Sequence, residues 1–220
     1  MLETIFSKEV FTCSMEAEGD PGWLHPEEAR CVRDAVPKRL REFAQGRHCA
    51  RQGLAHFEIQ DFPLLMGKDR APLWPDGIIG SLSHCAGYCA VAMARKGDLQ
   101  GVGLDVELAE PLEQELLPLI CTESETVRLG SSPAETRGVL AKLLFSVKES
   151  VFKCVYPQTG VFLDFHDCEV WLDSVRGSFV AHLMNPRLPR TFREARLQGR
   201  FAREGKRLFA GMVYPAGHSG

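Results

Sequence analysis

Two kinds of apolar pattern alternate along the chain, and together they predict an α+β fold. Three strand-length apolar runs, punctuated by glycine, lie at 78–83, 88–95 and 101–107. In the C-terminal third, apolar and polar residues alternate in four more segments, at 167–173, 177–183, 196–203 and 206–214. This alternation is typical of strands.

A long helix is predicted before each group of strands. The first begins at Pro26, where proline and the acids that follow suit a first helical turn. It is kinked or restarted at Pro37 and runs on toward Gly53. Proline and glycine mark 14–25 and 62–77 as loops.

The second long helix has two different faces. A capping box is predicted at Ser132–Glu135, and Pro157 is expected to stop the helix after about Val155. Helical spacing groups four apolar residues into a buried stripe: Leu140, Leu144, Val147 and Val151. The same spacing groups four polar residues on the opposite face: Lys142, Ser146, Glu149 and Lys153.

The order of these elements predicts two similar α/β half-domains in a pseudo-twofold arrangement. Each consists of a long helix packed on a small, mostly antiparallel sheet, and the halves meet near residue 107, as 1–107 and 108–220. The symmetry follows from the order of elements, because we find no sequence repeat.

Composition excludes several classes of function. The chain is 45% apolar and 25% charged, with a net charge of -3, which argues against a general nucleic-acid binder. No apolar run has the ~18 residues of a membrane helix, and the N-terminus does not resemble a signal peptide, so we expect a cytoplasmic protein. The eight cysteines are scattered and favour buried thiols over disulfides.

The segment Gly101–Glu107 contains the first candidate site residues. On a strand, Asp105 and Glu107 face the same side, where two carboxylates repel each other unless a cation neutralises them. Oxygen-only ligands favour magnesium or manganese. Two solvated surface acids remain the alternative. Glu149 from the second helix is the candidate third ligand, with a solvent-facing ion pair to Lys153 as the alternative.

Basic residues dominate the first long helix and the loop after it. Arginine and lysine side chains on a small patch suit a polyphosphorylated small molecule, whereas DNA would need a broader basic surface. The candidates are Arg39, Arg47 and Arg51 of the helix and Lys68 and Arg70 of the loop. A solvated helix face explains the helical residues equally well.

Ser83, His84 and Lys148 complete the candidate set. Ser83 and His84 end a predicted strand, but there is no G-x-S-x-G elbow, so we interpret them as phosphate donors and not as a hydrolase pair. A histidine satisfied in the core is the alternative. Lys148 lies beside Phe145 and Phe152, where its stem can pack while its amine reaches a phosphate.

In this order, the segments resemble the 4′-phosphopantetheinyl transferases of the surfactin-synthetase type, in particular the bacterial branch that serves siderophore and polyketide assembly. The resemblance extends over about residues 39 to 165. It is carried by five motifs: Arg41-Glu42-Phe43 with Gly46–Arg51, Pro72–Gly77, Gly80–Tyr88, Gly103–Glu107, and the 145–153 helix through Tyr156-Pro157.

The resemblance implies a reaction. Family members move the phosphopantetheine arm of coenzyme A onto a serine of an apo acyl, peptidyl or aryl carrier protein, as holo-carrier-protein synthases, and release 3′,5′-ADP. It implies Mg²⁺, with Mn²⁺ possible. It also implies a monomer, since the second half takes the place of a partner subunit, with no nucleic-acid or membrane partner.

The resemblance also implies roles for individual residues. The metal ligands would be Asp105, Glu107 and Glu149, and the catalytic residues Glu149, Lys153 and His84. Coenzyme A would be bound by Arg39, Arg47, Arg51, Lys68, Arg70, Ser83, His84, Lys148 and Lys153; which of Lys68 and Arg70 contacts the 3′-phosphate stays open. Leucines after Glu107 are candidates for carrier docking, although core packing explains most of them. A coenzyme A-binding homologue without activity and a metal-dependent phosphohydrolase remain the alternative functions.

Overall fold

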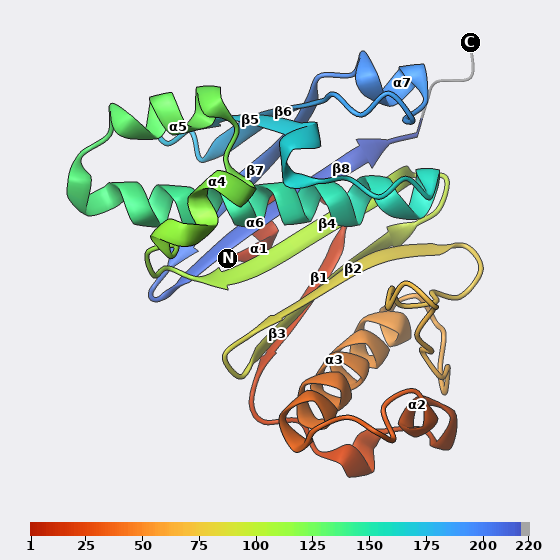
Figure 1. Ribbon diagram of the computed structural model, residues 1–220. Coiled ribbons are helices and arrows are strands. Elements are labelled where there is room, and N and C mark those ends of the chain that lie inside the picture. Colours follow the sequence, from red (N-terminus) through yellow and green to blue (C-terminus); the bar gives the residue numbers. More distant parts are fainter. Residues whose placement is uncertain (217–220) are drawn as a thin grey trace.

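The computed structural model describes residues 1–216 as an α+β fold in two parts (Figure 1). The first part contains α1 (Leu2–Ile5), β1 (Phe11–Glu16), η1 (Pro21–Trp23), α2 (Pro26–Arg30), α3 (Pro37–His56), β2 (Ile78–Cys85), β3 (Tyr88–Arg95) and β4 (Leu99–Leu108). The second contains η2 (Gln114–Leu116), α4 (Leu117–Ile120), α5 (Glu123–Gly130), α6 (Ala134–Thr159), η3 (Phe165–Asp167), β5 (Cys168–Asp173), β6 (Ser178–Leu183), α7 (Arg190–Arg193), β7 (Leu197–Glu204) and β8 (Arg207–Pro215).

Two antiparallel sheets confirm the predicted fold class. One has the strand order β1-β3-β2 and the other β4-β8-β7-β6-β5. All seven predicted strands form, but β1 was not predicted, and its second half lies in the segment assigned to a loop. Its side chains are only partly buried, because β1 is an edge strand, so its alternation is weak.

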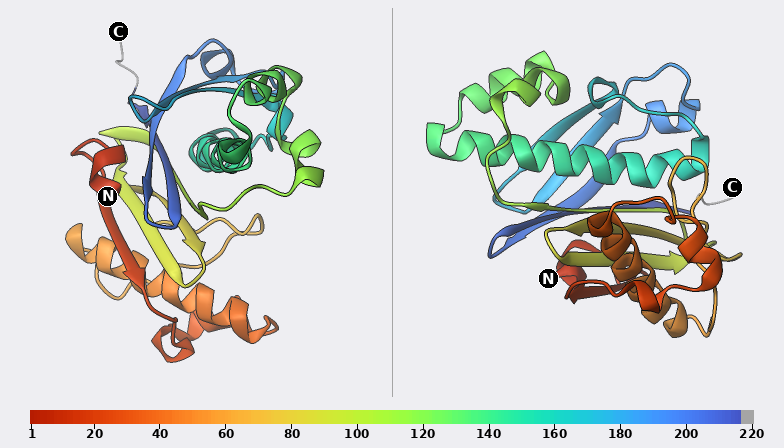
Figure 2. Two further views of the ribbon diagram at one scale, coloured as in Figure 1. Left: turned by 90° about the vertical axis from the view of Figure 1, so that its left-hand side faces the viewer. Right: turned by 60° about the horizontal axis from the view of Figure 1, so that its bottom comes forward.

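Strand β3 lies between two apolar layers. Its odd-numbered residues Cys89, Val91 and Met93 pack with the apolar face of α3. The even-numbered Ala90 and Ala92 join a second cluster with residues of β4 and β8. The two sheets therefore stack on each other, with α3 outside the smaller sheet and α6 against the larger one (Figure 2).

Strand β4 connects the two parts. It pairs with β8 along most of its length and also packs on β2. The boundary near residue 107 stays a prediction, because β4 pairs with the second part through β8 and packs on the first part through β2.

The face of β4 toward α6 explains the Gly101-x-Gly103 pattern. A Cβ atom at Gly103 would lie 1.9 Å from the carbonyl oxygen of Ser150, and one at Gly101 would lie 2.9 Å from that of Cys154. The helix therefore approaches β4 closely only because glycines stand there. The next residues on the same face are Asp105 and Glu107, which the strand thus presents to α6.

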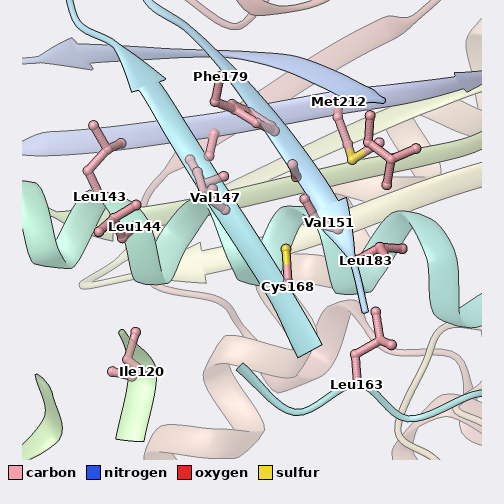
Figure 3. Close-up of a cluster of buried hydrophobic side chains, with 14 of the residues drawn as sticks. Ile120, Leu143, Leu144, Val147, Val151, Leu163, Cys168, Phe179, Leu183 and Met212 are labelled. Atoms are coloured by element: carbon pink, nitrogen blue, oxygen red, sulfur yellow. The ribbon is translucent and has the colours of Figure 1, made fainter. Parts of the chain in front are cut away.

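Helix α6 buries three of the four residues of its predicted apolar stripe against the larger sheet (Figure 3), whereas Leu140 is only partly buried there. Leu144, Val147 and Val151 are 4%, 0% and 0% exposed. The opposite face is not solvated, since Ser146 is also fully buried, against β4. The polar face of the helix therefore faces the interior of the molecule.

Helix α6 begins within one residue of its predicted start, but the predicted capping and the predicted C-terminal end were wrong. Pro133 is the N-cap residue, without a side-chain hydrogen bond, so the predicted capping box does not form. Pro157 lies inside the last turn, and the helix ends at Thr159. The C-cap residue Gly160 has a left-handed φ of 64°, and its N–H donates to the Tyr156 carbonyl. A proline so close to the C-terminus disturbs few hydrogen bonds of the helix, and the left-handed glycine terminates it.

Within residues 1–216, every helix is too short or too polar to span a bilayer.

Candidate active site

A cavity of about 310 Å³ opens between α3 and α6, and both predicted halves contribute to its wall. Its polar lining residues are Arg39, Glu42, Arg47, Arg70, Ser83, His84, Asp105, Glu107, Glu149 and Lys153. The structure thus brings nine of the twelve predicted site residues to one cavity. Arg51, Lys68 and Lys148 are not part of its wall.

Asp105 is the buried centre of a polar network at the base of this cavity. Lys153 Nζ donates to Asp105 Oδ1 at 2.6 Å, and the Ser83 hydroxyl donates to the same oxygen at 3.0 Å. Ser146 donates to Oδ2 at 2.8 Å. The Ser83 hydroxyl oxygen also accepts from the Val106 N–H at 3.2 Å. Ser83 therefore helps to fix the position of Asp105 on β4.

Glu107 and Glu149 are the less satisfied acids of the site. Burial raises the pKa of Glu107, and the neighbouring Asp105 raises it further, although Lys142 lies 3.6 Å from its carboxylate. Burial also raises the pKa of Glu149; Lys153 opposes that effect and Asp105 adds to it. The charge of Asp105 therefore disfavours ionisation of both neighbouring carboxyls.

This donor set fits a hard divalent cation. In the part of the chain described here, no group of three His, Cys, Asp or Glu side chains converges tightly enough to hold a metal ion. The positive charge nearest Asp105 is the Lys153 ammonium. However, three carboxylates with oxygen-only chemistry line one cavity. The raised pKa values of Glu107 and Glu149 indicate a demand for positive charge that magnesium or manganese would meet.

His84 lines the same cavity and contacts α3. Arg39 Nη1 donates to His84 Nε2 at 2.9 Å, and the Glu42 carboxylate lies 4.0 Å from the same nitrogen. An arginine only donates, so Nε2 is the acceptor and the ring is neutral. Burial is the main cause that lowers the pKa of His84; Arg39 and Lys153 contribute, and Glu42 opposes them.

Arg47 contributes its side chain to the wall, but its guanidinium is occupied elsewhere. It is 4% exposed, lies 3.8 Å from the centroid of the Phe43 ring, and donates to the Leu64 carbonyl at 2.7 Å. Burial lowers its pKa to about 10. The expected contact with a nucleotide phosphate is not available to this guanidinium in the present conformation.

Arg51 lies outside the cavity wall. It donates to both carboxylate oxygens of the fully buried Glu28, at 2.8 and 2.7 Å, and to the carbonyl of Trp23. The structure therefore supports a packing role and not nucleotide binding for this residue.

Lys148 is also directed away from the cavity. Its ammonium is sealed among three acceptors: the Glu125 carboxylate at 2.7 Å and the carbonyls of Ile120 and Phe165 at 2.7 and 2.8 Å. The exposed fraction of its side chain is 1%. All three of its donor hydrogens are used, so this arrangement does not support a contact with phosphate.

Of the two loop cations, Arg70 lies on the cavity wall, whereas Lys68 is exposed and outside it. Arg70 has a left-handed φ of 67°. It also lines a second cavity of about 340 Å³ beside Arg30, Arg33 and Arg39. Position therefore favours Arg70 as the residue that reaches a bound anion.

Two contributions to the site were not found from the sequence. Glu42 lies 3.8 Å from Arg39, and its helical spacing of three residues from that arginine was a readable signal. Phe43 and Phe145 give the cavity apolar walls. No local pattern distinguishes these aromatic residues from core residues.

A cavity lined by both cationic and carboxylate side chains suits an enzyme that acts on a phosphorylated ligand. Two family models match the chain: the 4′-phosphopantetheinyl transferase N-terminal domain over residues 27–94, and the 4′-phosphopantetheinyl transferase superfamily over residues 101–203. The chain belongs to the 4′-phosphopantetheinyl transferase family.

Individual relatives agree with this assignment. The chain is 44% identical over 173 residues to 4′-phosphopantetheinyl transferase Svp of Streptomyces mobaraensis, covering 78% of this chain and 70% of that protein. It is 33% identical over 195 residues to Npt of Nocardia iowensis, covering 84% and 86%. Enterobactin synthase component D of Salmonella typhimurium is 37% identical over 145 residues, covering 65% and 58%.

Proposed function

We propose that this protein transfers the 4′-phosphopantetheine arm of coenzyme A to a serine hydroxyl of an apo carrier protein, as a holo-carrier-protein synthase. The serine oxygen forms a bond to the β-phosphorus, the bond from that phosphorus to the bridging oxygen breaks, and 3′,5′-ADP leaves. The observation that carries the proposal is the cavity in which three carboxylates, Lys153 and His84 meet, in a chain of this family.

Asp105, Glu107 and Glu149 would hold the metal ion. Bound there, Mg²⁺ or Mn²⁺ supplies positive charge to the diphosphate as phosphoryl transfer proceeds. The raised pKa of Glu107 and of Glu149 supports this assignment, because both carboxylates lack sufficient compensation in the ligand-free protein.

Glu149, or a water beside it, is the proposed base for the carrier serine. Burial raises the pKa of Glu149, which makes this carboxylate a better proton acceptor than an exposed one. Lys153 balances charge on the leaving phosphate. Neutral His84, held by Arg39, orients the diphosphate through a ring N–H. Arg70 and Arg39 are the proposed contacts at the nucleotide end, and Lys148 and Arg51 are not included.

Glu149→Gln is therefore expected to lower kcat by roughly 10²–10³ while the protein stays folded. Intact-mass analysis of the carrier gives the rate, and circular dichroism gives the fold. Transfer at an undiminished rate by this variant would refute the base assignment.

The carrier protein is expected to dock after β4. Leu112 and Ile120 are buried at 5% and 4% exposure and belong to the core, whereas Leu116 and Leu119 are 36% and 63% exposed. Leu116→Glu is expected to raise the KM for the carrier, with kcat and the KM for coenzyme A unchanged. Val175→Glu, at an apolar residue that is 97% exposed on the turn between β5 and β6, is the control. An unchanged carrier KM for Leu116→Glu counts against docking there.

One assay separates the proposed function from its alternatives. The protein is incubated with coenzyme A, magnesium and a panel of apo acyl, peptidyl and aryl carrier proteins, and each carrier is weighed. A gain of one phosphopantetheine supports transfer, and free phosphate without carrier modification supports hydrolysis. If neither is observed, the protein only binds coenzyme A. The likeness to enterobactin synthase component D makes carriers of siderophore and polyketide assembly the first to test.

A further inference from the structure

The part of the cavity wall that carries Arg70 is a closed loop. The Leu73 N–H donates to the Leu65 carbonyl at 3.0 Å, and the Gly67 N–H donates to the Ala71 carbonyl at 2.9 Å. These bonds fix residues 65 to 73 relative to one another. The position of the loop in the molecule is therefore set at its base.

That base is held by a carboxylate with no exposed surface. Glu28, from the short helix α2, is 0% exposed. Its Oε1 accepts from the Leu64 N–H at 2.9 Å, and its Oε2 accepts from the His25 N–H at 2.9 Å. Arg51 of α3 donates to both oxygens. One side chain thus joins α2, α3 and the start of the loop.

A second side chain of α3 binds the same residue at its carbonyl group. Arg47 donates to the Leu64 carbonyl at 2.7 Å, and its guanidinium lies 3.8 Å from the centroid of the Phe43 ring. Leu64 therefore has both its N–H and its C=O fixed by buried charged groups, just before the loop turns into the cavity wall.

We propose that Glu28 is a positioning residue for the nucleotide end of coenzyme A. It acts through Leu64 and the closed loop on Arg70, which lines the cavity, and it does not touch the ligand. The inference rests on the proposed function, since it concerns the same cavity. It also gives a role to Arg47 and Arg51, whose side chains are engaged in holding the loop.

The chemistry of Glu28 makes a sharp variant possible. Every group around its carboxylate is a donor: two backbone N–H groups and a guanidinium. In Glu28→Gln the amide NH₂ must face one of these donors, so one buried group loses its partner, although size and shape are kept. Glu28→Asp keeps the charge but shortens the side chain, so it restores part of the contact.

The experiment compares KM and kcat for both substrates. Glu28→Gln is expected to raise the KM for coenzyme A about tenfold, as the loss of one buried partner implies. Its kcat and its KM for the carrier protein should stay within about twofold of the unaltered protein. Glu28→Asp should give a smaller shift in the same direction. Glu27→Gln, the exposed neighbour on the same helix, is the matched control and should change nothing.

Two measurements test the proposal without transfer. Amide exchange at 64–73 should become faster in Glu28→Gln than in Glu27→Gln, and the affinity for 3′,5′-ADP, measured by calorimetry, should fall about tenfold. If Glu28→Gln does not fold, Glu28→Asp is used for both.

Faster loop exchange with unchanged KM and 3′,5′-ADP affinity would overturn the positioning role, as would a fall in kcat alone. Failure of the proposed function is distinct, because the unaltered protein would then modify no carrier, while 3′,5′-ADP binding would still respond to Glu28.

Discussion

Helix α6 carries two lysines that form ion pairs of nearly the same length in very different surroundings. Lys148 lies 2.7 Å from Glu125, and the two side chains are 1% and 0% exposed. Lys153 lies 2.6 Å from Asp105, with side chains 26% and 5% exposed. The two lysines are five residues apart, so they point to different sides of the helix.

The partners of each pair explain why only one belongs to the candidate site. Glu125 accepts from two backbone N–H groups besides Lys148, those of Thr122 and Val170. These bonds join α5, α6 and the edge strand β5, and nothing is left over for a ligand. Around Lys153 the carboxylates Glu107 and Glu149 still lack positive charge. The Lys148–Glu125 pair therefore stabilises the fold, whereas Glu107 and Glu149 beside Lys153 can still interact with a ligand.

The largest effect is expected for Lys148→Met, which leaves the Glu125 carboxylate buried without its cation. Removing one partner of a buried ion pair typically costs about 3–5 kcal/mol. We expect a loss of that size in the free energy of unfolding, measured by urea denaturation. Transfer by the remaining folded protein should stay within a few-fold of normal.

A double-mutant cycle with Glu125→Gln tests the pairing directly. The losses should be strongly non-additive, with the double variant close to the worse single one. A 10²-fold loss of kcat in a fully stable Lys148→Met protein would instead show that this lysine faces the phosphate. Both lysines would then belong to the active site.

The opposite behaviour is expected for Asp105→Asn. The remaining oxygen still accepts from Lys153 and Ser83, and the new NH₂ donates to the Ser146 hydroxyl, which can rotate to accept it. Stability should therefore change little, whereas kcat should fall roughly 10²–10³-fold because a metal ligand is lost. Manganese binding, followed by electron paramagnetic resonance, should weaken in parallel. Full-affinity manganese binding would exclude Asp105 as a ligand.

Periodicity accounts for the predicted site residues that the structure places together in the cavity. The period of two along β4 places Asp105 and Glu107 on one face, and helical spacing aligns Glu149 with Lys153. Both results depend on neighbours within one element. The glycine pattern before Asp105 was noticed, but its reason, the close approach of α6, needs the tertiary structure.

Long-range partners account for what was missed. Lys148 and Arg51 each pair with an acid 23 residues earlier in the chain, and no local pattern shows that such an acid will be buried. For Lys148 the sequence does contain a signal, because Thr122 and Glu125 have the spacing of a capping box, which predicts that Glu125 lies in the first turn of a helix. For Arg51 the comparable signal is Glu28, which stands at the same position of α2 and accepts from the N–H of the N-cap residue His25.

The smallest predicted effect is a gain in stability from Glu107→Gln in the ligand-free protein. The folded pKa of Glu107 lies above its ordinary value of 4.5, so folding favours the protonated form. The stability that protonation adds is fully present below pH 4.5 and is lost as the pH rises through the folded pKa. At pH 7 the neutral glutamine avoids that loss, and a gain of up to about 1 kcal/mol would raise Tm by about 2–4 °C. The gain in stability should shrink as the pH falls toward 4.5, and Glu113→Gln, at an exposed acid, should show no such gain.

Magnesium with coenzyme A should make the unaltered protein the more stable of the two, because these ligands stabilise only a protein that holds them. If the variant is less stable than the unaltered protein at every pH, Glu107 is a satisfied acid like Glu125.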